Sequence, residues 1–377
     1  MEAVKFCVLY PFSLRYRKRK LWLVSERGMD ARDNGYHMFR YIREHDPSRE
    51  VYYVIAKDSA DRKKVEPFGN VIDYGSIRHY LMFLAADVLI STHIMGFSPN
   101  RNFYTTLIKR IPLHGKTVFL QHGIIYSDLR QLYAENTHAD LFICGAKQEY
   151  DYIRETFGYK HDEVKYTGLA RYDNLYDCKL KRQILIMPTW RRKLADMVKR
   201  GQSIAGTDYV RRWNGLLNDP RLLKAAEEHE VGIVFYPHYE MQKHIELFSS
   251  PSQNVVIADF DHYDVQQLLK ESALLITDSS SVHFDFAYMK KPCLYYQFDW
   301  QDFLANHYAK GYYDHRTMGF GEVTDDEAEL VELVIGYIET DFREKEEYQR
   351  RVEAFFTLRD QNNCRRIYEE IIRLERQ

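Results

Sequence analysis

The sequence predicts an α/β protein with two parallel sheets, each covered by helices on both faces. Short apolar runs alternate along the chain with helix-length segments, a pattern typical of strands joined by helical crossovers. Most of these runs are apolar throughout rather than alternating, as expected of strands that are buried on both faces. The chain has 377 residues, which is too long for one compact core and suits two domains.

The apolar runs predict ten strands. They lie at 21–26, 51–56, 87–92, 117–123, 140–145, 183–190, 232–238, 254–259, 273–278 and 292–298. Because ten strands in one open sheet would be unusual, we expect two sheets of about five strands. Helical spacing of apolar residues predicts helices at 35–47, 76–86 and 265–273, and a charged segment that is helical throughout 326–377.

A polar, charged stretch at 175–183 precedes a fresh strand and is expected to separate the two domains. The first domain is placed at 1–178 and carries His122, and the second is placed at 179–340. Helices in the remaining segment, 341–377, are expected to pack across both domains.

Charge and cysteine usage exclude several classes of protein. The net charge of −2 gives no bulk attraction to polyanions, and no nucleic-acid-binding motif is present. The five cysteines are scattered and form no CxxC pair, which argues against a disulfide framework and a structural zinc site and favours buried free thiols. With no apolar run of membrane-spanning length and no secretion signal, a cytoplasmic location is expected.

Reactive residues follow several of the predicted strands. In doubly wound sheets, ligands bind beyond the carboxyl ends of the strands. His122 and Gly123 end one predicted strand, Arg191 follows another and His238 ends a third. The run Thr277, Asp278, Ser279, Ser280 and Ser281 ends a fourth. These four strand ends therefore form the candidate site.

The serine-rich run favours phosphate binding. Ser279–Ser281 stand where a helix is expected to begin, and the free backbone N–H groups of a helix start attract anions. The alternative is an ordinary N-cap, which needs only one such residue. Arg191 offers a guanidinium that can fork onto phosphate oxygens, against the alternative of a solvated pair with Arg192.

His122 and His238 are the candidate catalytic groups, one in each predicted domain. An imidazole titrates near neutrality, so it can take a proton from an attacking hydroxyl, and a second can stabilise a phosphoryl group. The alternative is that each histidine is structural. No HxxxH or HExxH spacing accompanies them. No tightly bound metal is therefore expected, while a loosely bound Mg²⁺ stays open.

Two further segments have less specific patterns. Asp33 and Asn34 can contact an acceptor at the cleft, or simply turn the chain and cap the next helix. A basic cluster with aromatic neighbours can sit on anionic lipid or be a solvated arm, and lipid is favoured over nucleic acid. The basic residues are Arg15, Arg17, Lys18, Arg19 and Lys20.

The ordered motifs together resemble the CDP-glycerol glycerophosphotransferase family, which primes and polymerises teichoic acids and related polyol-phosphate polymers. They are "DNGYHMFRYI", "LQHG", "GLARYD", "PTWR", "YPH" and "ITDSSSVHFDFAYMKKPCLYYQFD", and they run from about residue 22 to about 322. The family has a GT-B-like fold, with two Rossmann-like domains facing a central cleft. Ser279 replaces the aromatic residue usual between the family's Asp and Ser, which leaves details of the donor pocket open.

This resemblance implies transfer of glycerol phosphate from CDP-glycerol to a hydroxyl of a lipid-linked acceptor, with release of CMP. It implies His122 as the base, and His238 in catalysis or phosphate binding. Thr277, Asp278, Ser280 and Ser281 are implied at the donor diphosphate, with Arg191 in the same pocket. It also implies peripheral attachment to the inner face of the cell membrane.

Two alternatives remain open. One is a transferase that uses CDP-ribitol or a nucleotide sugar on the same fold, and the other is a non-catalytic membrane-associated scaffold that binds nucleotide. The acceptor, the polymer, priming or polymerisation, and the oligomeric state stay open.

Overall fold

The computed structural model describes residues 2–100, 102, 113–176, 179–306 and 309–377. These residues form two compact units. Unit 1 contains Met1–Ile124, Arg130–Asn174 and Thr357–Gln377, and unit 2 contains Ile125–Leu129 and Leu175–Phe356. The chain leaves unit 1 after Asn174, and residues 177 and 178, at the expected domain boundary, lie outside the described part. Each unit is described by itself below.

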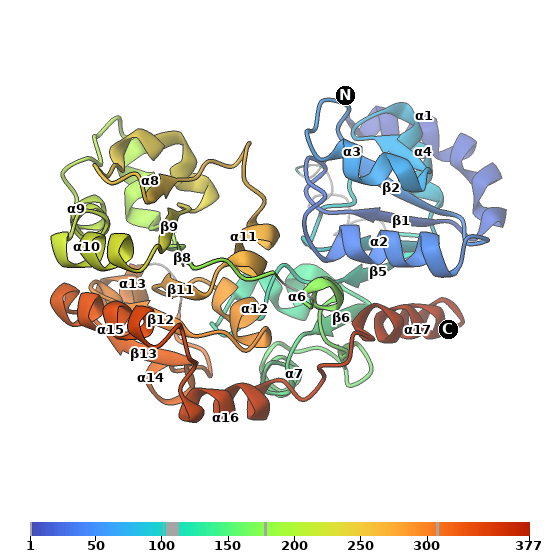
Figure 1. Cartoon of the computed structure of the whole chain (residues 1–377). Helices are drawn as coiled ribbons and strands as arrows, with labels where there is room; N and C mark the ends of the chain where they lie inside the picture. The colour runs from blue at the N-terminus through green and yellow to red at the C-terminus, as the bar shows by residue number, and fades with distance from the viewer. Residues whose placement is uncertain (1, 101, 103–112, 177–178, 307–308) are drawn as a thin grey trace. The chain divides into compact units, whose positions relative to one another are not determined.

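Unit 1 is built on a seven-stranded parallel sheet in the order β3-β2-β1-β4-β5-β6-β7 (Figure 1). The strands are β1 (Trp22–Ser25), β2 (Val51–Ile55), β3 (Val71–Asp73), β4 (Val88–Ser91), β5 (Lys116–Phe119), β6 (Leu141–Cys144) and β7 (Val164–Tyr166). The strand order reverses between β1 and β4, which is the topological switch point of a Rossmann-like sheet.

The helical segments of unit 1 are α1 (Glu2–Ser13), η1 (Leu14–Arg19), α2 (Asn34–His45), α3 (Arg62–Val65), η2 (Glu66–Phe68), α4 (Ile77–Ala85), η3 (Arg130–Leu132), α6 (Ala134–Thr137), α7 (Lys147–Thr156), η4 (Ala170–Asn174) and α17 (Asn363–Glu375). The amphipathic helix α2 packs against β1 and β2 through Met38, Phe39 and Ile42, which are fully buried. Helix α17 returns from the far end of the chain to pack on α2 and η4.

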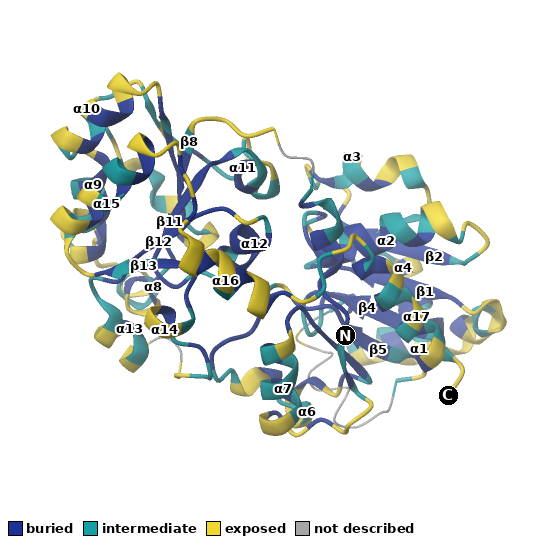
Figure 2. Cartoon of the chain, turned by 60° about the horizontal axis from the view of Figure 1, so that its bottom comes forward, coloured by how far each residue is buried: buried dark blue, intermediate teal, exposed yellow. Residues whose placement is uncertain are grey.

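Unit 2 repeats this plan with six parallel strands in the order β10-β9-β8-β11-β12-β13. The strands are β8 (Gln183–Ile186), β9 (Gly232–Phe235), β10 (Val255–Ile257), β11 (Leu274–Thr277), β12 (Cys293–Tyr296) and β13 (Gly321–Thr324). Its switch point lies between β8 and β11. In both units the central strands are buried, as the dark blue strands of Figure 2 show.

The helical segments of unit 2 are α8 (Arg192–Lys199), α9 (Asp208–Leu217), α10 (Pro220–Glu228), η5 (Tyr239–Leu247), α11 (Val265–Glu271), α12 (Val282–Tyr288), α13 (Trp300–Asn306), α14 (His315–Met318), α15 (Glu327–Glu339) and α16 (Glu346–Phe355). Asp219, Asp264 and Asp326 cap the first turns of α10, α11 and α15 with their side chains.

The fold class of the prediction is confirmed, with corrections in detail. The sheets hold seven and six strands rather than about five each. The three strands that the pattern missed are short and lie at sheet edges: β3, β7 and β13. The segment 326–377 is not helical throughout but breaks into α15, α16 and α17, and only α17 belongs to unit 1. The arrangement of both units around a cleft stays a prediction.

The cysteine prediction holds for most of the chain but not at its start. Cys144, Cys293 and Cys364 are buried free thiols, whereas Cys7 is free and exposed on α1. Cys178 lies outside the described residues.

Candidate active site

In unit 1, three loops beside the switch point bring titratable side chains together. Glu26 follows β1, His93 follows β4, and His122 follows β5. Strand β5 ends at Phe119, so His122 stands in the loop after the strand, whereas the sequence predicts it within the end of the strand itself. Because β1, β4 and β5 are parallel neighbours, their carboxyl ends lie at one edge of the sheet.

His122 pairs with Asp33, the residue that caps α2. The Nδ1 atom of His122 lies 2.5 Å from Oδ2 of Asp33, and the other carboxylate oxygen accepts from the Arg171 guanidinium at 2.8 Å. Arg171 also donates to the backbone carbonyl of His122 at 2.9 Å. Asp33 is only 8 % exposed, whereas 60 % of the His122 side chain is exposed. Asp33 therefore fixes the Nδ1 side of the imidazole, and most of the rest of the ring is exposed to solvent.

This geometry fixes the protonation of the pair. Burial alone would raise the pKa of Asp33, but the charges of His122 and Arg171 outweigh it and hold that pKa well below its usual value. The carboxylate is thus ionised and accepts the proton on Nδ1 of His122, so whenever the ring is neutral its lone pair lies on Nε2. An imidazole with that tautomer can act as a general base.

The backbone that carries His122 is turned into an unusual conformation. Gln121 has a φ of 62°, in the left-handed region that residues other than glycine seldom adopt. Asn34 stabilises the turn, because its amide donates to the carbonyls of Leu120 and Gln121 at 3.3 and 2.9 Å. Its side-chain oxygen accepts from the backbone N–H of Arg171 at 2.9 Å.

Asn34 is thus fully buried and supports the loop from behind, rather than lining the site as predicted. Gly123, the other predicted neighbour of His122, is partly buried, and its contact with an acceptor stays a prediction.

Glu26 anchors the start of α2 from inside the unit. Its carboxylate accepts from the backbone N–H groups of Arg32, Asp33 and Tyr36 at 3.0, 2.9 and 2.9 Å. Burial and the nearby charge of Asp33 raise the pKa of Glu26 to about 7. The three backbone N–H donors lower this pKa, but by less than the other two effects raise it. Glu26 therefore titrates near neutral pH while its carboxylate accepts from the backbone N–H of Asp33.

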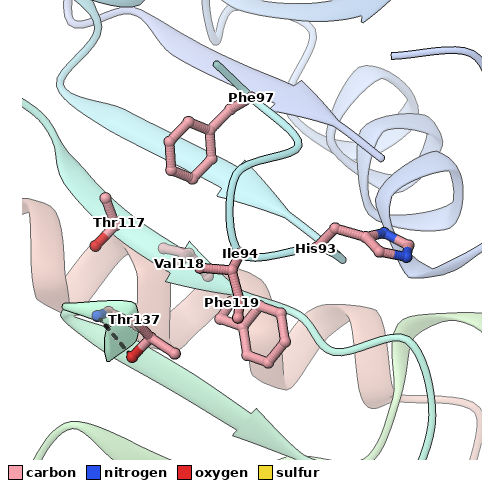
Figure 3. Close-up of a pocket in the computed structure, with 8 residues that line it drawn as sticks. His93, Ile94, Phe97, Thr117, Val118, Phe119 and Thr137 are labelled. Atoms are coloured by element: carbon pink, nitrogen blue, oxygen red, sulfur yellow. Dashed lines mark hydrogen bonds between the residues drawn. The ribbon is translucent and has the colours of Figure 1, made fainter. Parts of the chain in front are cut away.

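A second histidine flanks His122. The ring centroids of His93 and His122 are 5.1 Å apart. Arg27 donates through Nε to Nε2 of His93 at 3.2 Å, and Nδ1 of His93 lies 2.9 Å from the Thr92 hydroxyl. His93 is also one of the residues that line a small, mainly apolar cavity, but its ring points away from the other labelled side chains (Figure 3).

In unit 2, the loops after β8 and β11 are joined at the switch point. Asp278 accepts from the backbone N–H of Thr189 at 2.9 Å and from that of Ser279 at 2.6 Å. The Ser279 hydroxyl lies 3.4 Å from that of Thr189. Tyr126, from the short segment Ile125–Leu129, donates its hydroxyl to the Ser279 carbonyl. The serine-rich loop is therefore held on both sides.

Arg191 holds protein carboxylates in this structure, which differs from the predicted phosphate fork. Its guanidinium forms a bidentate pair with Asp299 at 2.7 and 2.8 Å and an ion pair with Asp278 at 2.8 Å, and it donates to the Thr189 carbonyl at 2.7 Å. Burial would lower the pKa of Arg191, but the two carboxylates raise it well above its usual value. Arg191 is 6 % exposed and is neither solvated nor open to a ligand here.

Thr277 and Asp278 are likewise buried rather than open to a phosphate. Thr277 is fully buried and donates its hydroxyl to the Met187 carbonyl at 2.6 Å, and Asp278 is 1 % exposed. Both side chains shape the loop from within, and their direct contact with the donor stays a prediction.

The serines lie at the start of α12, as predicted. Ser281 occupies the N-cap position, but its side chain makes no capping hydrogen bond, so the ordinary capping alternative is not what this helix uses. Ser279 is 4 % exposed, whereas Ser280 and Ser281 are partly exposed. Of the predicted run, the last two hydroxyls are therefore the ones a ligand can reach.

His238 caps the short helix η5 in the loop after β9. Its Nδ1 accepts from the backbone N–H of Glu240 at 3.2 Å, so the neutral ring carries its proton on Nε2. Its ring centroid lies 6.2 Å from that of Trp190, in the loop after β8. His238 is partly exposed. The ring thus belongs to the same edge of the sheet as Thr189 and Ser279, and it offers a donor where His122 offers an acceptor.

Among the residues of these sites that have no role in the sequence prediction are Glu26, His93, Arg171 and Asp299. Arg171 lies within the quoted "GLARYD" motif, and Asp299 is the last residue of the quoted "CLYYQFD". A charged residue directly after a buried strand was the available signal for Glu26, and a histidine close after a strand was the signal for His93.

Two properties of the described residues bear on the remaining predictions. Within this part of the chain, no three His, Cys, Asp or Glu side chains are grouped as metal ligands would be. No helix in these residues has both the length and the apolar character needed to cross a bilayer.

The chain matches one protein family and is similar to teichoic acid biosynthesis proteins. Residues 8–373 match the family model described as CDP-Glycerol:Poly(glycerophosphate) glycerophosphotransferase. The minor teichoic acid biosynthesis protein GgaB of Bacillus subtilis (strain 168) is 35 % identical over 369 residues, which cover 96 % of this chain and 40 % of that protein. The teichoic acid ribitol-phosphate polymerase TarK of Staphylococcus aureus (strain NCTC 8325 / PS 47) is 26 % identical over 171 residues, or 41 % of this chain and 31 % of that one. The chain thus spans less than half the length of either relative.

Solved structures agree on the fold. The wall teichoic acid polymerase TagF aligns over 99 % of this chain and 93 % of its own, with a TM-score of 0.68 and 15 % identity. The UDP-GlcNAc 2-epimerase from Neisseria meningitidis aligns over 94 % of this chain and 99 % of its own, with a TM-score of 0.52 and 12 % identity. At these identities the likeness supports the GT-B-like fold alone.

Proposed function

Because this chain belongs to the CDP-glycerol:poly(glycerophosphate) glycerophosphotransferase family, we propose that it transfers glycerol phosphate from CDP-glycerol to a hydroxyl of a lipid-linked acceptor in teichoic-acid-like or capsular polymer synthesis. The observation that carries this proposal is the pair His122–Asp33, an exposed imidazole held at 2.5 Å by a buried, ionised carboxylate. A base so arranged suits the activation of a hydroxyl for attack on phosphorus.

In the proposed reaction, the acceptor hydroxyl attacks the β-phosphorus of CDP-glycerol. Nε2 of His122 takes the hydroxyl proton as the new O–P bond forms, and the P–O bond to CMP breaks. Asp33 holds the imidazolium that results. Positioning and charge stabilisation contribute most of the rate in phosphoryl transfer, so the remaining residues act mainly on the charge of the phosphates.

We assign the donor phosphates to the loop after β11. The hydroxyls of Ser280 and Ser281 and the Nε2 proton of His238 are the donors that suit an anion there. Arg191, Thr277 and Asp278 position this loop through their buried contacts. No resident metal is proposed, and a loosely held Mg²⁺ on the diphosphate stays compatible with this arrangement.

The chain links the two sites covalently. Tyr126 lies four residues after His122 and belongs to unit 2, where its hydroxyl donates to the Ser279 carbonyl. We propose, from membership of the family alone, that His122 and the serine loop act on one donor. We further propose that the exposed part of the basic cluster, Arg15 and Lys18–Lys20, contacts an anionic membrane on its cytoplasmic face.

A second candidate donor is CDP-ribitol, which the ribitol-phosphate polymerase among the relatives favours. Fold does not decide between the two donors. Purified chain is incubated with an acceptor and with CDP-glycerol, CDP-ribitol or a UDP-sugar in turn, and the release of CMP or UDP is followed. CMP from CDP-glycerol alone supports the first proposal, and CMP from CDP-ribitol alone overturns it in favour of the second. Binding of a CDP-polyol without CMP release would indicate a nucleotide-binding scaffold.

A further inference from the structure

A second polar group lies beside His122 in unit 1, and the reaction proposed above does not use it. Its members are His93, in the loop after β4, and Arg27, in the loop after β1. The ring centroid of His93 is 5.1 Å from that of His122, and Nε of Arg27 is 3.2 Å from Nε2 of His93. Arg27 is therefore linked to the proposed base through a single imidazole ring.

His93 holds Arg27 by accepting a hydrogen bond. Because Nε–H of Arg27 donates to Nε2 of His93, that nitrogen carries the lone pair, and the neutral ring has its proton on Nδ1. Nδ1 lies 2.9 Å from the Thr92 hydroxyl, which accepts from it. The ring of His93 is thus fixed at both nitrogens, and it points away from the other labelled side chains that line the apolar cavity (Figure 3).

The two loops that carry this pair are joined through their backbones. The Ser91 hydroxyl donates to the Glu26 carbonyl at 3.3 Å and accepts from the backbone N–H of His93 at 3.1 Å. Gly96 lies so close to Glu26 that a Cβ atom at this position would collide with the Glu26 carbonyl oxygen. A glycine here therefore lets the loop after β4 pack directly on the residue before Arg27, which sets the position of Arg27 before any ligand arrives.

Arg27 can be reached by a ligand, whereas Arg191 cannot. The side chain of Arg27 is 37 % exposed, while Arg191 is 6 % exposed and forms a bidentate pair with Asp299. The nearest carboxylate oxygen of Asp30 is 3.6 Å from Nε of Arg27, which is longer than a hydrogen bond. Arg27 therefore suits an incoming phosphate, whose oxygens match the fork of a guanidinium.

We propose that Arg27, positioned by His93, binds a phosphate of the acceptor and so selects acceptors that already end in a glycerol phosphate unit. This rests on the proposed function, in which Nε2 of His122 takes the proton of the acceptor hydroxyl. In a terminal glycerol phosphate unit, the phosphate lies one glycerol away from that hydroxyl. A hydroxyl placed at His122 thus brings an anion close by, and Arg27 is a cation one imidazole away. Such selection favours the extension of a polymer over the addition of its first unit.

The first test measures binding without any reaction. Isothermal titration calorimetry compares the parent chain with Arg27→Ala, using a soluble glycerol phosphate dimer that has a terminal hydroxyl and, separately, CDP-glycerol. We expect Arg27→Ala to weaken binding of the dimer by about 10- to 100-fold, the usual value of hydrogen bonds to a charged group, and to change binding of CDP-glycerol far less. Arg40→Ala is the matched control, because the Arg40 side chain is 40 % exposed and pairs with Glu44 on α2. It should alter neither affinity.

Two outcomes of the calorimetry would overturn the inference. If the parent chain does not bind the dimer, no acceptor phosphate is held there, whether or not the chain is an enzyme. If Arg27→Ala weakens the binding of CDP-glycerol as much as that of the dimer, or more, the phosphate at Arg27 belongs to the donor.

Substitutions of His93 test its role in positioning Arg27. The amide oxygen introduced by His93→Gln can still accept from Arg27, whereas His93→Leu offers no acceptor. We expect His93→Gln to bind the dimer nearly as the parent does, and His93→Leu to lose about as much affinity as Arg27→Ala. Equal losses in the two His93 variants would contradict the positioning role.

Turnover separates this inference from the proposed function. CMP release from CDP-glycerol is followed with a lipid-linked acceptor that ends in glycerol phosphate and with one that ends in a neutral sugar hydroxyl. The parent should have the lower KM for the first, and Arg27→Ala should raise that KM by about 10- to 100-fold at nearly constant kcat, so that the preference is lost. Equal KM values of the parent for both acceptors would overturn the inference. CMP release with neither acceptor would defeat the proposed function, while the calorimetry still decides whether Arg27 holds a phosphate.

Discussion

Replacing Asp33 by asparagine isolates the contribution of the carboxylate to the base. The substituted amide would keep an oxygen for Arg171, whose guanidinium lies 2.8 Å from the parent carboxylate, and would present its NH₂ group to Nδ1 of His122. The imidazole then has to accept at Nδ1 and carry its proton on Nε2, which is the tautomer that cannot take a proton from the acceptor.

The size of the effect follows from this geometry. Losing the correct tautomer removes the base, which is worth about 10²–10⁴ in turnover. Such a loss corresponds to about 3–5 kcal/mol in the activation free energy. Because Asp33 is 8 % exposed and is turned toward His122 and Arg171, the KM for the donor should change little.

The assay is CMP release from CDP-glycerol at saturating acceptor, with kcat and KM determined separately. Asp61→Asn is the matched control, since Asp61 is a 4 % exposed carboxylate paired with Arg32 and Lys64 and without a bond to His122. It should lower stability while nearly sparing kcat. A kcat for Asp33→Asn within about tenfold of the parent, or equal losses in the two variants, would refute the role given to Asp33.

Two further predictions concern the buried charges. Arg191→Ala leaves Asp278 and Asp299 without their cation and should lower the free energy of unfolding, measured by urea titration, by about 3–5 kcal/mol. Arg192→Ala, at the exposed neighbour, should lower it by less than about 1 kcal/mol. Equal losses in the two variants would contradict the pairing of Arg191 with these carboxylates. For Glu26, the pKa in the folded state is about 7, above the unfolded value of 4.5, so the protein releases a proton when it unfolds between these two pH values. The free energy of unfolding therefore falls as the pH rises from 4.5 to 7, by up to about 3 kcal/mol. Glu26→Gln should remove this part of the pH dependence of the free energy of unfolding, and an unchanged slope between pH 4.5 and 7 would contradict it.

Elements with strong local signals could be predicted from the amino-acid sequence alone. The runs 51–56 and 273–276 are apolar, and they contain β2 and most of β11. The edge strands β3 and β7 have three residues each, and their pattern does not differ from that of a loop. Their pairing is decided by the neighbouring strand, which no local pattern reports.

The candidate site likewise has a part that the sequence could predict and a part that it could not. Motif residues at strand ends could be chosen from their order along the chain. Asp33 and Ser281 follow β1 and β11, which border the switch points of their sheets, and His122 follows β5, the neighbour of β4. The partner of each group could not be chosen in this way. Arg191 is predicted as a phosphate ligand because nothing near it in the sequence indicates that its guanidinium binds Asp299, which lies 108 positions away. Likewise, the contact between Asp33 and His122 joins residues 89 positions apart.

The central claim is that His122, held by Asp33, is the base of a glycerol-phosphate transfer, and product analysis tests it most directly. The parent chain and His122→Ala are each given CDP-glycerol and a lipid-linked acceptor, and CMP and the mass of the acceptor are measured. The account predicts that the parent releases CMP as the acceptor gains glycerol phosphate, and that His122→Ala still binds CDP-glycerol but turns over about 10²–10⁴ more slowly. An acceptor of unchanged mass with the parent chain, or His122→Ala as fast as the parent, would contradict it.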